Sequence, residues 1–360
     1  MVTTVTPEEL LSSQRPVFDV RAPVEFAKGT LPWAVNLPLM NDHERARVGT
    51  CYKQQGPEAA IALGHELVSG DVKAQRLAAW QDFIDAHPQA VLFCFRGGLR
   101  SQLVQQWLAE AGLHIPLVAG GYKALRQHLM AINEQAAQRP LFVVAGTTGS
   151  GKTDFIHHFP QAVDLEDLAC HRGSAFGRRV TPQPSPVTFE NRLAMALRGQ
   201  TGPLLLEDES RLIGSVAVPL ALHRAMAKAP IFLLEAPLAE RVERIHQQYI
   251  QQNLAEQQAR LAPDAAFNAF AEGLQASLKG ISRRLGDQRY RQLAELMSAA
   301  LTAQQQQGDN SGHRQWIAQL LTDYYDPMYH YQLDKLQQRI VARGSADQLA
   351  ATLTAALAAR

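Results

Sequence analysis

A buried strand that runs directly into a glycine-rich, lysine-bearing loop restricts the fold of this chain more than any other feature. Residues 141–145 (LFVVA) form an apolar run typical of a buried strand. Residues 146–153 (GTTGSGKT) follow at once and fit the phosphate-binding pattern GxxxxGK-Ser/Thr, between a strand and a helix. In such a loop the backbone N–H groups wrap a diphosphate and the helix N-terminus adds positive potential. The sequence therefore predicts an α/β domain that binds phosphate.

The chemistry expected of this loop follows from its residue types. The predicted diphosphate-binding residues are Gly146, Gly149, Ser150, Gly151, Lys152 and Thr153. Lys152 is expected to neutralise the outer phosphate. A second apolar run, residues 203–206, ends in Glu207 and Asp208, and one of these carboxylates is expected to face a metal ion unless they form a solvated acidic turn. We expect no tightly bound cofactor, with Mg²⁺ held through Thr153 and Asp208 as the candidate metal site.

A second anion-binding loop is predicted where another apolar run, residues 90–93, ends at Cys94. The loop reads CFRGGLRS over residues 94–101, and its expected anion-binding residues are Arg96, Gly97, Gly98, Arg100 and Ser101. Inward N–H groups and arginines favour anions, including a thiolate, so Cys94 is the candidate catalytic nucleophile. The alternative is a cysteine that is simply buried at a strand end.

Composition excludes several classes of protein. The 360 residues suffice for two domains, and a net charge of +1 means that any nucleic-acid site must be a local patch. Three scattered cysteines make neither a disulfide framework nor a zinc site. The sequence shows neither a signal peptide nor an apolar run of about 18 residues, so we expect a cytoplasmic protein with no membrane partner.

The first third of the chain resembles the rhodanese domain. The resemblance rests on the following residues: Asp19-Val20-Arg21, Glu25-Phe26, Gly29, Pro32-Trp33-Ala34, Asn36-Leu37-Pro38, the Cys94 loop and Gly120-Gly121. It implies a parallel sheet and a cysteine that carries sulfur or selenium. The loop departs from the usual pattern because Cys-x5-Arg-Ser is one residue longer, a spacing shared with cysteine phosphatases. From the loop alone, three candidates stay open: a sulfurtransferase, a phosphatase, and an enzyme that takes a chalcogen from a phosphate compound.

The predicted organisation is therefore α/β throughout. A rhodanese-like parallel-sheet domain (1–132) precedes a polar linker (133–140), a P-loop α/β domain (141–250) and an associated helical C-terminal region (251–360). Two basic segments are candidate tRNA contacts, although the one at residues 171–179 could instead be a lid and either could be solvated. Their residues are Arg172, Arg178, Arg179, Lys279, Arg283 and Arg284. The aromatic stretch at residues 324–331 can stack on bases, line an apolar pocket or pack the C-terminal helices together, and packing is the favoured interpretation.

Nearly end to end, the chain resembles bacterial tRNA 2-selenouridine synthases. The matching residues are the Cys94 loop, residues 119–123 (AGGYK), the P-loop, residues 189–191 (FEN), residues 206–210 (LEDES) and residues 325–329 (YDPMY). The resemblance implies that selenium replaces sulfur at the wobble 2-thiouridine of tRNA. It further implies S-geranylation from geranyl diphosphate at the P-loop, followed by selenation from selenophosphate at Cys94, with a selenophosphate-producing enzyme as the donor source.

Three other functions compete with this one. A tRNA kinase or ATPase with a rhodanese module would use the P-loop for nucleotide turnover. A rhodanese-type sulfurtransferase would need only the Cys94 loop. A non-catalytic tRNA-binding protein would keep its function without Cys94.

Overall fold

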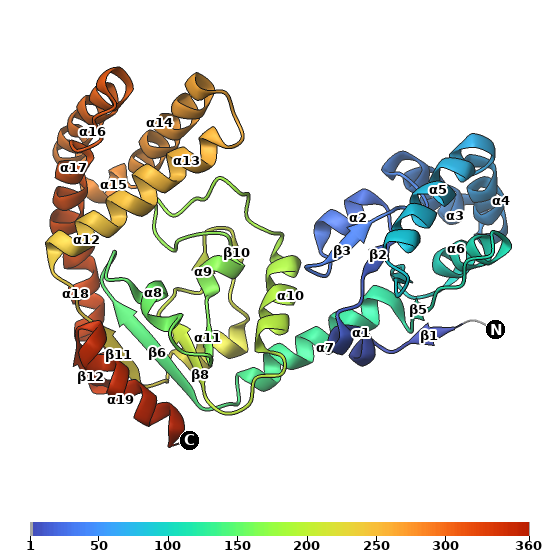
Figure 1. Ribbon diagram of the computed structural model, residues 1–360, viewed down its shortest axis with the longest axis horizontal. Coiled ribbons are helices and arrows are strands. Elements are labelled where there is room, and N and C mark those ends of the chain that lie inside the picture. The colour runs from blue at the N-terminus through green and yellow to red at the C-terminus, as the bar shows by residue number, and fades with distance from the viewer. Residues whose placement is uncertain (1–2, 360) are drawn as a thin grey trace. The chain divides into compact units, whose positions relative to one another are not determined.

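The computed structural model describes residues 3–359 and divides them into two compact units. The first unit comprises the chain up to Asn133 together with Ser185–Arg198, and the second comprises Glu134–Pro184 and the chain from Gly199 onward. Each unit contains its own parallel sheet, as Figure 1 shows. The predicted α/β class with two parallel-sheet domains is confirmed.

The sheet of the first unit has five strands in the order β1-β5-β4-β2-β3, and every pair is parallel. The strands are β1 (Thr4–Val5), β2 (Val17–Asp19), β3 (Ala34–Asn36), β4 (Val91–Phe93) and β5 (Leu117–Val118). Successive side chains of a strand point to opposite faces. Leu92 accordingly packs in one core, whereas Val91 and Phe93 pack in another on the opposite face. A sheet covered on both faces explains why β4 is apolar throughout.

Helices surround this sheet: α1 (Pro7–Ser13), α2 (Pro23–Lys28), α3 (Asp42–Gln55), α4 (Pro57–Leu67), α5 (Gly70–Ala86), α6 (Leu99–Glu110) and α7 (Gly121–Ala136). Helix α6 begins at Leu99, within the last residues of the Cys94 loop, and helix α7 begins at the Gly120-Gly121 pair. The linker is predicted to begin at residue 133, but in the structure α7 continues to Ala136, so the first residues of the predicted linker are helical.

One helix from the middle of the chain belongs to the first unit, which the predicted boundaries did not allow. Helix α10 (Pro186–Leu197) lies between two segments of the second unit in sequence. Its Asn191 is fully buried and donates from Nδ2 to the Thr30 carbonyl (2.8 Å) and to the Tyr122 hydroxyl (3.0 Å). The Arg126 guanidinium donates to Asn191 Oδ1 at 2.9 Å and also pairs with Glu190. These partners are far away in sequence, so local patterns could not assign the helix.

The second unit also has a five-stranded parallel sheet, in the order β12-β11-β6-β8-β7. The strands are β6 (Leu141–Gly146), β7 (Ala162–Val163), β8 (Leu204–Glu207), β11 (Ile231–Leu234) and β12 (Ile340–Gly344), and a small antiparallel pair is made by β9 (Leu212–Ile213) and β10 (Val216–Ala217). The edge strand β12 comes from the region predicted to be helical. It pairs with β11 and carries the final helix back onto the sheet.

The remaining elements of this unit are α8 (Lys152–Ile156), α9 (Leu165–Leu168), α11 (Leu220–Met226), α12 (Leu238–Ile245), α13 (Asn253–Gln258), α14 (Pro263–Gly280), α15 (Ser282–Leu285), α16 (Asp287–Gln307), α17 (His313–Leu320), α18 (Asp326–Asp334), α19 (Ala346–Ala358), the π-helical turns η1 (His246–Gln252) and η2 (Leu321–Tyr325), and the 3₁₀ turn η3 (Gln337–Arg339). Helices α12 to α17 share an apolar core of their own. Among the described residues, no helix is long and apolar enough to cross a bilayer.

Candidate functional sites

The Cys94 loop is fixed by backbone contacts with the start of α7. The Tyr122 N–H donates to the Cys94 carbonyl and the Lys123 N–H donates to the Phe95 carbonyl, both at 2.9 Å. Gly121 (φ +60°) passes so close that a Cβ there would lie 2.4 Å from the Cys94 carbonyl oxygen. The loop shape therefore depends on a glycine outside the loop itself.

The sulfur of Cys94 is nearly enclosed and has a polar partner. Cys94 is 3% exposed, and the fully buried Ser101 donates from its hydroxyl to Sγ at 2.8 Å. The same hydroxyl lies 3.3 Å from the Gly98 carbonyl. Ser101, predicted as an anion ligand, thus contacts the candidate nucleophile Cys94, and a hydroxyl donor stabilises negative charge on sulfur.

The two arginines of the loop differ in their surroundings. Arg100 makes a two-pronged ion pair with Glu25, with N···O distances of 2.7 and 3.3 Å. Burial opposes ionisation of Glu25, but the hydrogen bond and charge of Arg100 outweigh it and lower the pKa of that carboxyl. Arg96 is exposed, with its guanidinium 5.8 Å from the centre of the Phe95 ring. Arg96 is consequently the better placed of the two to meet an incoming anion. Sequence reasoning gave Glu25 no role, although it noted the residue in the motif.

The predicted P-loop of the second unit joins β6 to α8 and contains two glycines in the left-handed region, Gly149 (φ +80°) and Gly151 (φ +88°). A Cβ on Gly146 would lie 2.5 Å from Ser150 Oγ, so this position also requires glycine. The ammonium of Lys152 donates to the Gly146 carbonyl at 3.1 Å. Burial would lower the pKa of Lys152, but Tyr329, Glu209 and Glu166 raise it more, and the group stays charged.

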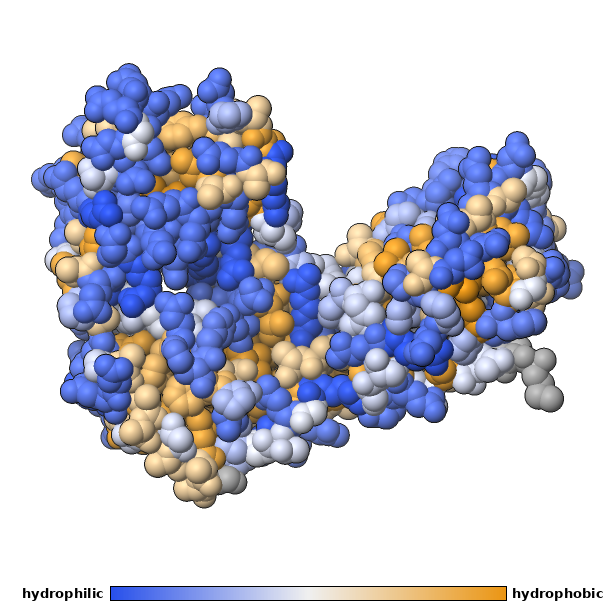
Figure 2. Space-filling view, viewed as in Figure 1, coloured by the Kyte–Doolittle hydropathy of each residue, from blue (hydrophilic) through white to orange (hydrophobic). Residues whose placement is uncertain are grey.

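A cavity of about 610 Å³ opens over this P-loop. Figure 2 shows the surface of the second unit hollowed, with hydrophilic residues around the opening. One side of the cavity is the loop from Thr148 to Asp154 with acidic neighbours. The opposite side is built by residues of η1, η2 and α18, namely Tyr249, Tyr324, Tyr325, Met328 and Tyr329, together with Ile245. Rather than only packing helices, the aromatic stretch at residues 324–331 lines a pocket, and the π-helical turns that carry part of it are frequent at functional sites.

Three carboxylates gather beside Lys152. One oxygen from each of Glu166, Glu207 and Glu209 lies within 4.8 Å of the others. Burial and mutual repulsion raise the pKa of Glu166 to about 8 and raise the pKa of Glu207 and Glu209. Both oxygens of Glu207, which is fully buried, have no hydrogen-bond partner among the described residues. Such a cluster needs a proton or a cation, and carboxylate oxygens suit Mg²⁺.

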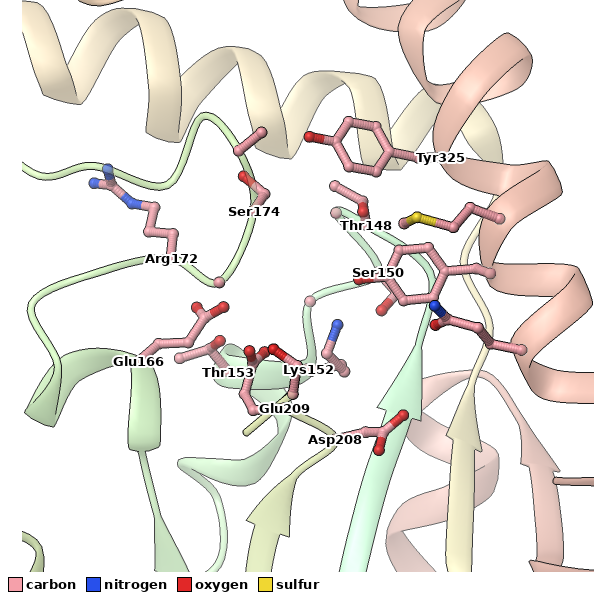
Figure 3. A pocket seen from close by; sticks show the side chains of 18 of the residues that line it. Thr148, Ser150, Lys152, Thr153, Glu166, Arg172, Ser174, Asp208, Glu209 and Tyr325 are labelled. Carbon is pink, nitrogen blue, oxygen red and sulfur yellow. The ribbon is translucent and has the colours of Figure 1, made fainter. Parts of the chain in front are cut away.

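The cluster differs from the predicted metal pair, Thr153 with Asp208. The chain turns tightly after β8, where the Glu209 N–H donates to the Glu207 carbonyl at 2.9 Å, and the carboxylates of these two residues lie near each other. Figure 3 shows Glu166 and Glu209 close together beside Lys152, with Asp208 farther from Glu166. Thr153 and Asp208 both line the cavity. The i, i+2 spacing could have identified Glu209, whereas nothing in the sequence near Glu166 marks it.

The P-loop is braced by a residue that the sequence did not reveal. Arg241 of α12 is buried and donates from Nε to the Thr148 carbonyl at 2.9 Å. Its two other nitrogens pair with Asp326 at 2.5 and 3.1 Å. Arg241 therefore connects the phosphate loop to the YDPMY motif, which lies about 180 residues later in the sequence.

The structure brings most of the predicted tRNA-binding arginines together. Arg178, Arg179, Arg283 and Arg284 line one cleft of about 770 Å³, along with Phe176 and Phe270. Arg172 instead lines the P-loop cavity and donates to Asn253 Oδ1 at 2.8 Å. Lys279 is exposed and lies outside the residues that line either space. The loop at residues 171–179 thus borders both the P-loop cavity and the basic cleft.

Comparison with known proteins identifies both domains of the chain. The tRNA 2-selenouridine synthase AAA domain matches residues 139–360, and the rhodanese-like domain matches residues 6–128. Relatives named tRNA 2-selenouridine synthase include one from Shewanella denitrificans, 54% identical with 93% of each chain covered. One from Hahella chejuensis is 54% identical over 94% of this chain and 90% of the relative, and one from Shewanella sediminis is 51% identical over 94% and 93%. The predicted resemblance is confirmed, and the chain belongs to the tRNA 2-selenouridine synthase family.

Proposed function

We propose that this chain converts the wobble 2-thiouridine of tRNA to 2-selenouridine in two steps, one at each site. In the first step, C1 of geranyl diphosphate bonds to the 2-thio sulfur, the bond from C1 to the diphosphate oxygen breaks, and N3 of the base loses its proton. In the second step, selenium of selenophosphate bonds to C2 while the C2–S bond breaks and geranylthiolate leaves. Water then cleaves the P–Se bond to release inorganic phosphate, and protons pass to N3 of the base and to the thiolate, which departs as geranylthiol. Alkylation makes the sulfur a good leaving group, which explains why the first step precedes the second.

The observation that carries the proposal is the two-sided character of the P-loop cavity. Its loop wall offers backbone N–H groups and a charged Lys152 to a diphosphate, and residues of η1, η2 and α18 add a group of aromatic and apolar side chains to the lining, among polar and cationic ones. An allylic diphosphate has the same two-sided character. Stabilising negative charge as it develops on the departing diphosphate is the catalytic contribution expected of such a loop.

Mg²⁺ fits the carboxylates beside the loop. Glu207 and Glu209, with Glu166, would hold the ion, and the ion would supply positive charge to the diphosphate when bound. The buried Glu207 carboxylate has no hydrogen-bond partner among the described residues, and a bound cation would compensate its charge, which supports this assignment.

The Cys94 loop is proposed to take selenophosphate. Arg96 and the loop N–H groups would bind the phosphoryl oxygens, and Ser101 would stabilise the Cys94 thiolate through its hydrogen bond to Sγ. In this assignment Cys94 is the catalytic residue of the selenation step, and its thiolate lies beside the bound selenophosphate. The basic cleft of the second unit would hold the tRNA backbone.

The test is mass spectrometry of nucleosides from 2-thiouridine tRNA incubated with geranyl diphosphate, with and without selenophosphate. Cys94→Ala should stop at the S-geranylated nucleoside, whereas Lys152→Ala should leave 2-thiouridine unchanged. Matched controls are Cys51→Ala, a buried cysteine of the same unit, and Lys228→Ala, an exposed lysine of the second unit. If wild-type protein forms neither product but consumes ATP or thiosulfate, a kinase or a sulfurtransferase replaces this proposal.

A further inference from the structure

The first unit contains an apolar cavity, which the reaction described so far does not use. It measures about 220 Å³ and lies between α3, α4 and α6. Its lining is almost entirely carbon, from side chains such as Val48, Ala60, Ile61, Leu103 and Trp107. An apolar cavity of about 150 Å³ suffices to bind benzene. The larger cavity here is therefore of a size to hold a branched chain of more than six carbons.

This cavity adjoins the Cys94 loop. Leu99 and Arg100, which close that loop and open α6, both line the cavity. The next residue, Ser101, donates its hydrogen bond to Cys94 Sγ. A ligand whose reacting atom lies at Cys94 could thus extend an apolar tail between α4 and α6.

The residues at the mouth of the cavity are unusually exposed for their type. Leu99 is 57% exposed, Tyr52 is 60% exposed and Ile61 is 41% exposed. Apolar side chains gain free energy when a ligand removes them from water. The cation in the lining, Arg100, is already paired with Glu25, so the cavity offers little to a phosphate or a nucleotide. These features select an uncharged hydrocarbon ligand.

We propose that this cavity between α3, α4 and α6 binds the geranyl chain of the S-geranylated nucleoside while selenium displaces the thioether at the Cys94 loop. The inference rests on the proposed function and adds a substrate subsite to its second step. The cavity holds the geranyl group before the C2–S bond breaks, as part of the thioether, and afterwards, as geranylthiol. It thereby selects geranylated over unmodified tRNA at the Cys94 loop.

The kinetic test uses the full chain with two pre-alkylated tRNAs, one carrying S-geranyl-2-thiouridine and one carrying S-methyl-2-thiouridine, plus selenophosphate. Ile61→Glu places a charge at the mouth of the cavity, and Val72→Glu, at an exposed apolar residue of α5 that does not line it, is the matched control. We expect Ile61→Glu to lower kcat/KM at least tenfold for the S-geranyl substrate, mainly through KM. It should leave the S-methyl substrate and the geranylation step unchanged, and Val72→Glu should behave as wild type.

A binding experiment gives a readout besides activity. Trp107 lines the cavity, so titration with geraniol as a stable probe should change its fluorescence. Trp107→Phe should remove that change, which separates it from any effect of geraniol in the P-loop cavity. Ile61→Glu should weaken the binding at least tenfold, whereas Ile61→Val should keep it.

Two outcomes would overturn the subsite, and both differ from failure of the proposed function. If Ile61→Glu slows S-methyl and S-geranyl substrates equally, the cavity does not bind the chain. The same conclusion follows if geraniol leaves Trp107 fluorescence unchanged in a protein that selenates S-geranyl tRNA. If wild-type protein cannot selenate S-geranyl tRNA at all, the two-step function itself is wrong.

Discussion

Replacement of Asn191 by alanine should weaken the first unit, because this residue ties α10 to it. The substitution removes the amide N–H groups of Asn191, which donate to the Thr30 carbonyl at 2.8 Å and to the Tyr122 hydroxyl at 3.0 Å. It also removes the acceptor for Arg126 at 2.9 Å. Arg126 keeps its ion pair with Glu190, so the groups left without a hydrogen-bond partner are mainly the Thr30 carbonyl and the Tyr122 hydroxyl. Each orphaned buried group costs about 1–3 kcal/mol, so we expect a loss of about 3 kcal/mol in total.

For a unit of about 150 residues, this loss should lower the melting temperature by about 6–12 °C. Tryptophan fluorescence can follow that unit alone. Trp33, Trp80 and Trp107 lie in it, and a Trp316→Phe background removes the signal of the second unit. The matched control is Asn253→Ala in the second unit.

The result that would refute this reasoning is a shift below about 2 °C for Asn191→Ala in the first-unit transition, or an equal shift for Asn253→Ala. Either result would mean that α10 contributes little to the first unit. It would then behave as an insertion whose contacts with the first unit do not matter for stability.

Four further predictions concern the two sites and the helical core. Gly121→Ala should distort the Cys94 loop and accumulate the S-geranylated nucleoside, whereas Gly112→Ala, which also has a positive φ but open space, should not. Arg241→Lys, which cannot make all three hydrogen bonds, should slow geranylation about tenfold in a single-turnover assay and spare selenation of pre-geranylated tRNA. Chelation by EDTA should abolish geranylation, added Mg²⁺ should restore it, and an unaffected rate would contradict the carboxylate site. Burial lowers the pKa of His313 from 6.5 to about 4. The free energy of unfolding, measured with urea, should therefore decrease as the pH is lowered from 6.5 to about 4, because the unfolded chain takes up a proton that the folded chain does not. His313→Gln should make this free energy depend less on pH in the same range.

Sequence alone determined those features that depend on neighbours in the chain. Each apolar run that leads into a loop became a strand of a parallel sheet, and both anion-binding loops follow such strands. Local chemistry suffices here because four or five apolar residues fix burial and the glycines fix the backbone of the turn. The resemblance to the family rested on the same local motifs.

Tertiary structure decided which distant residues share a site. It moved α10 into the first unit, added β12 to the second sheet and brought Glu166 to Glu207 and Glu209. It also paired Arg100 with Glu25 and Arg241 with Asp326, so that each loop is held by a residue from another element. These contacts depend on how sheets and helices pack, and no spacing along the chain encodes them. The sequence therefore located the candidate site residues, whereas the packing decided their partners, their charge and the apolar cavities beside them.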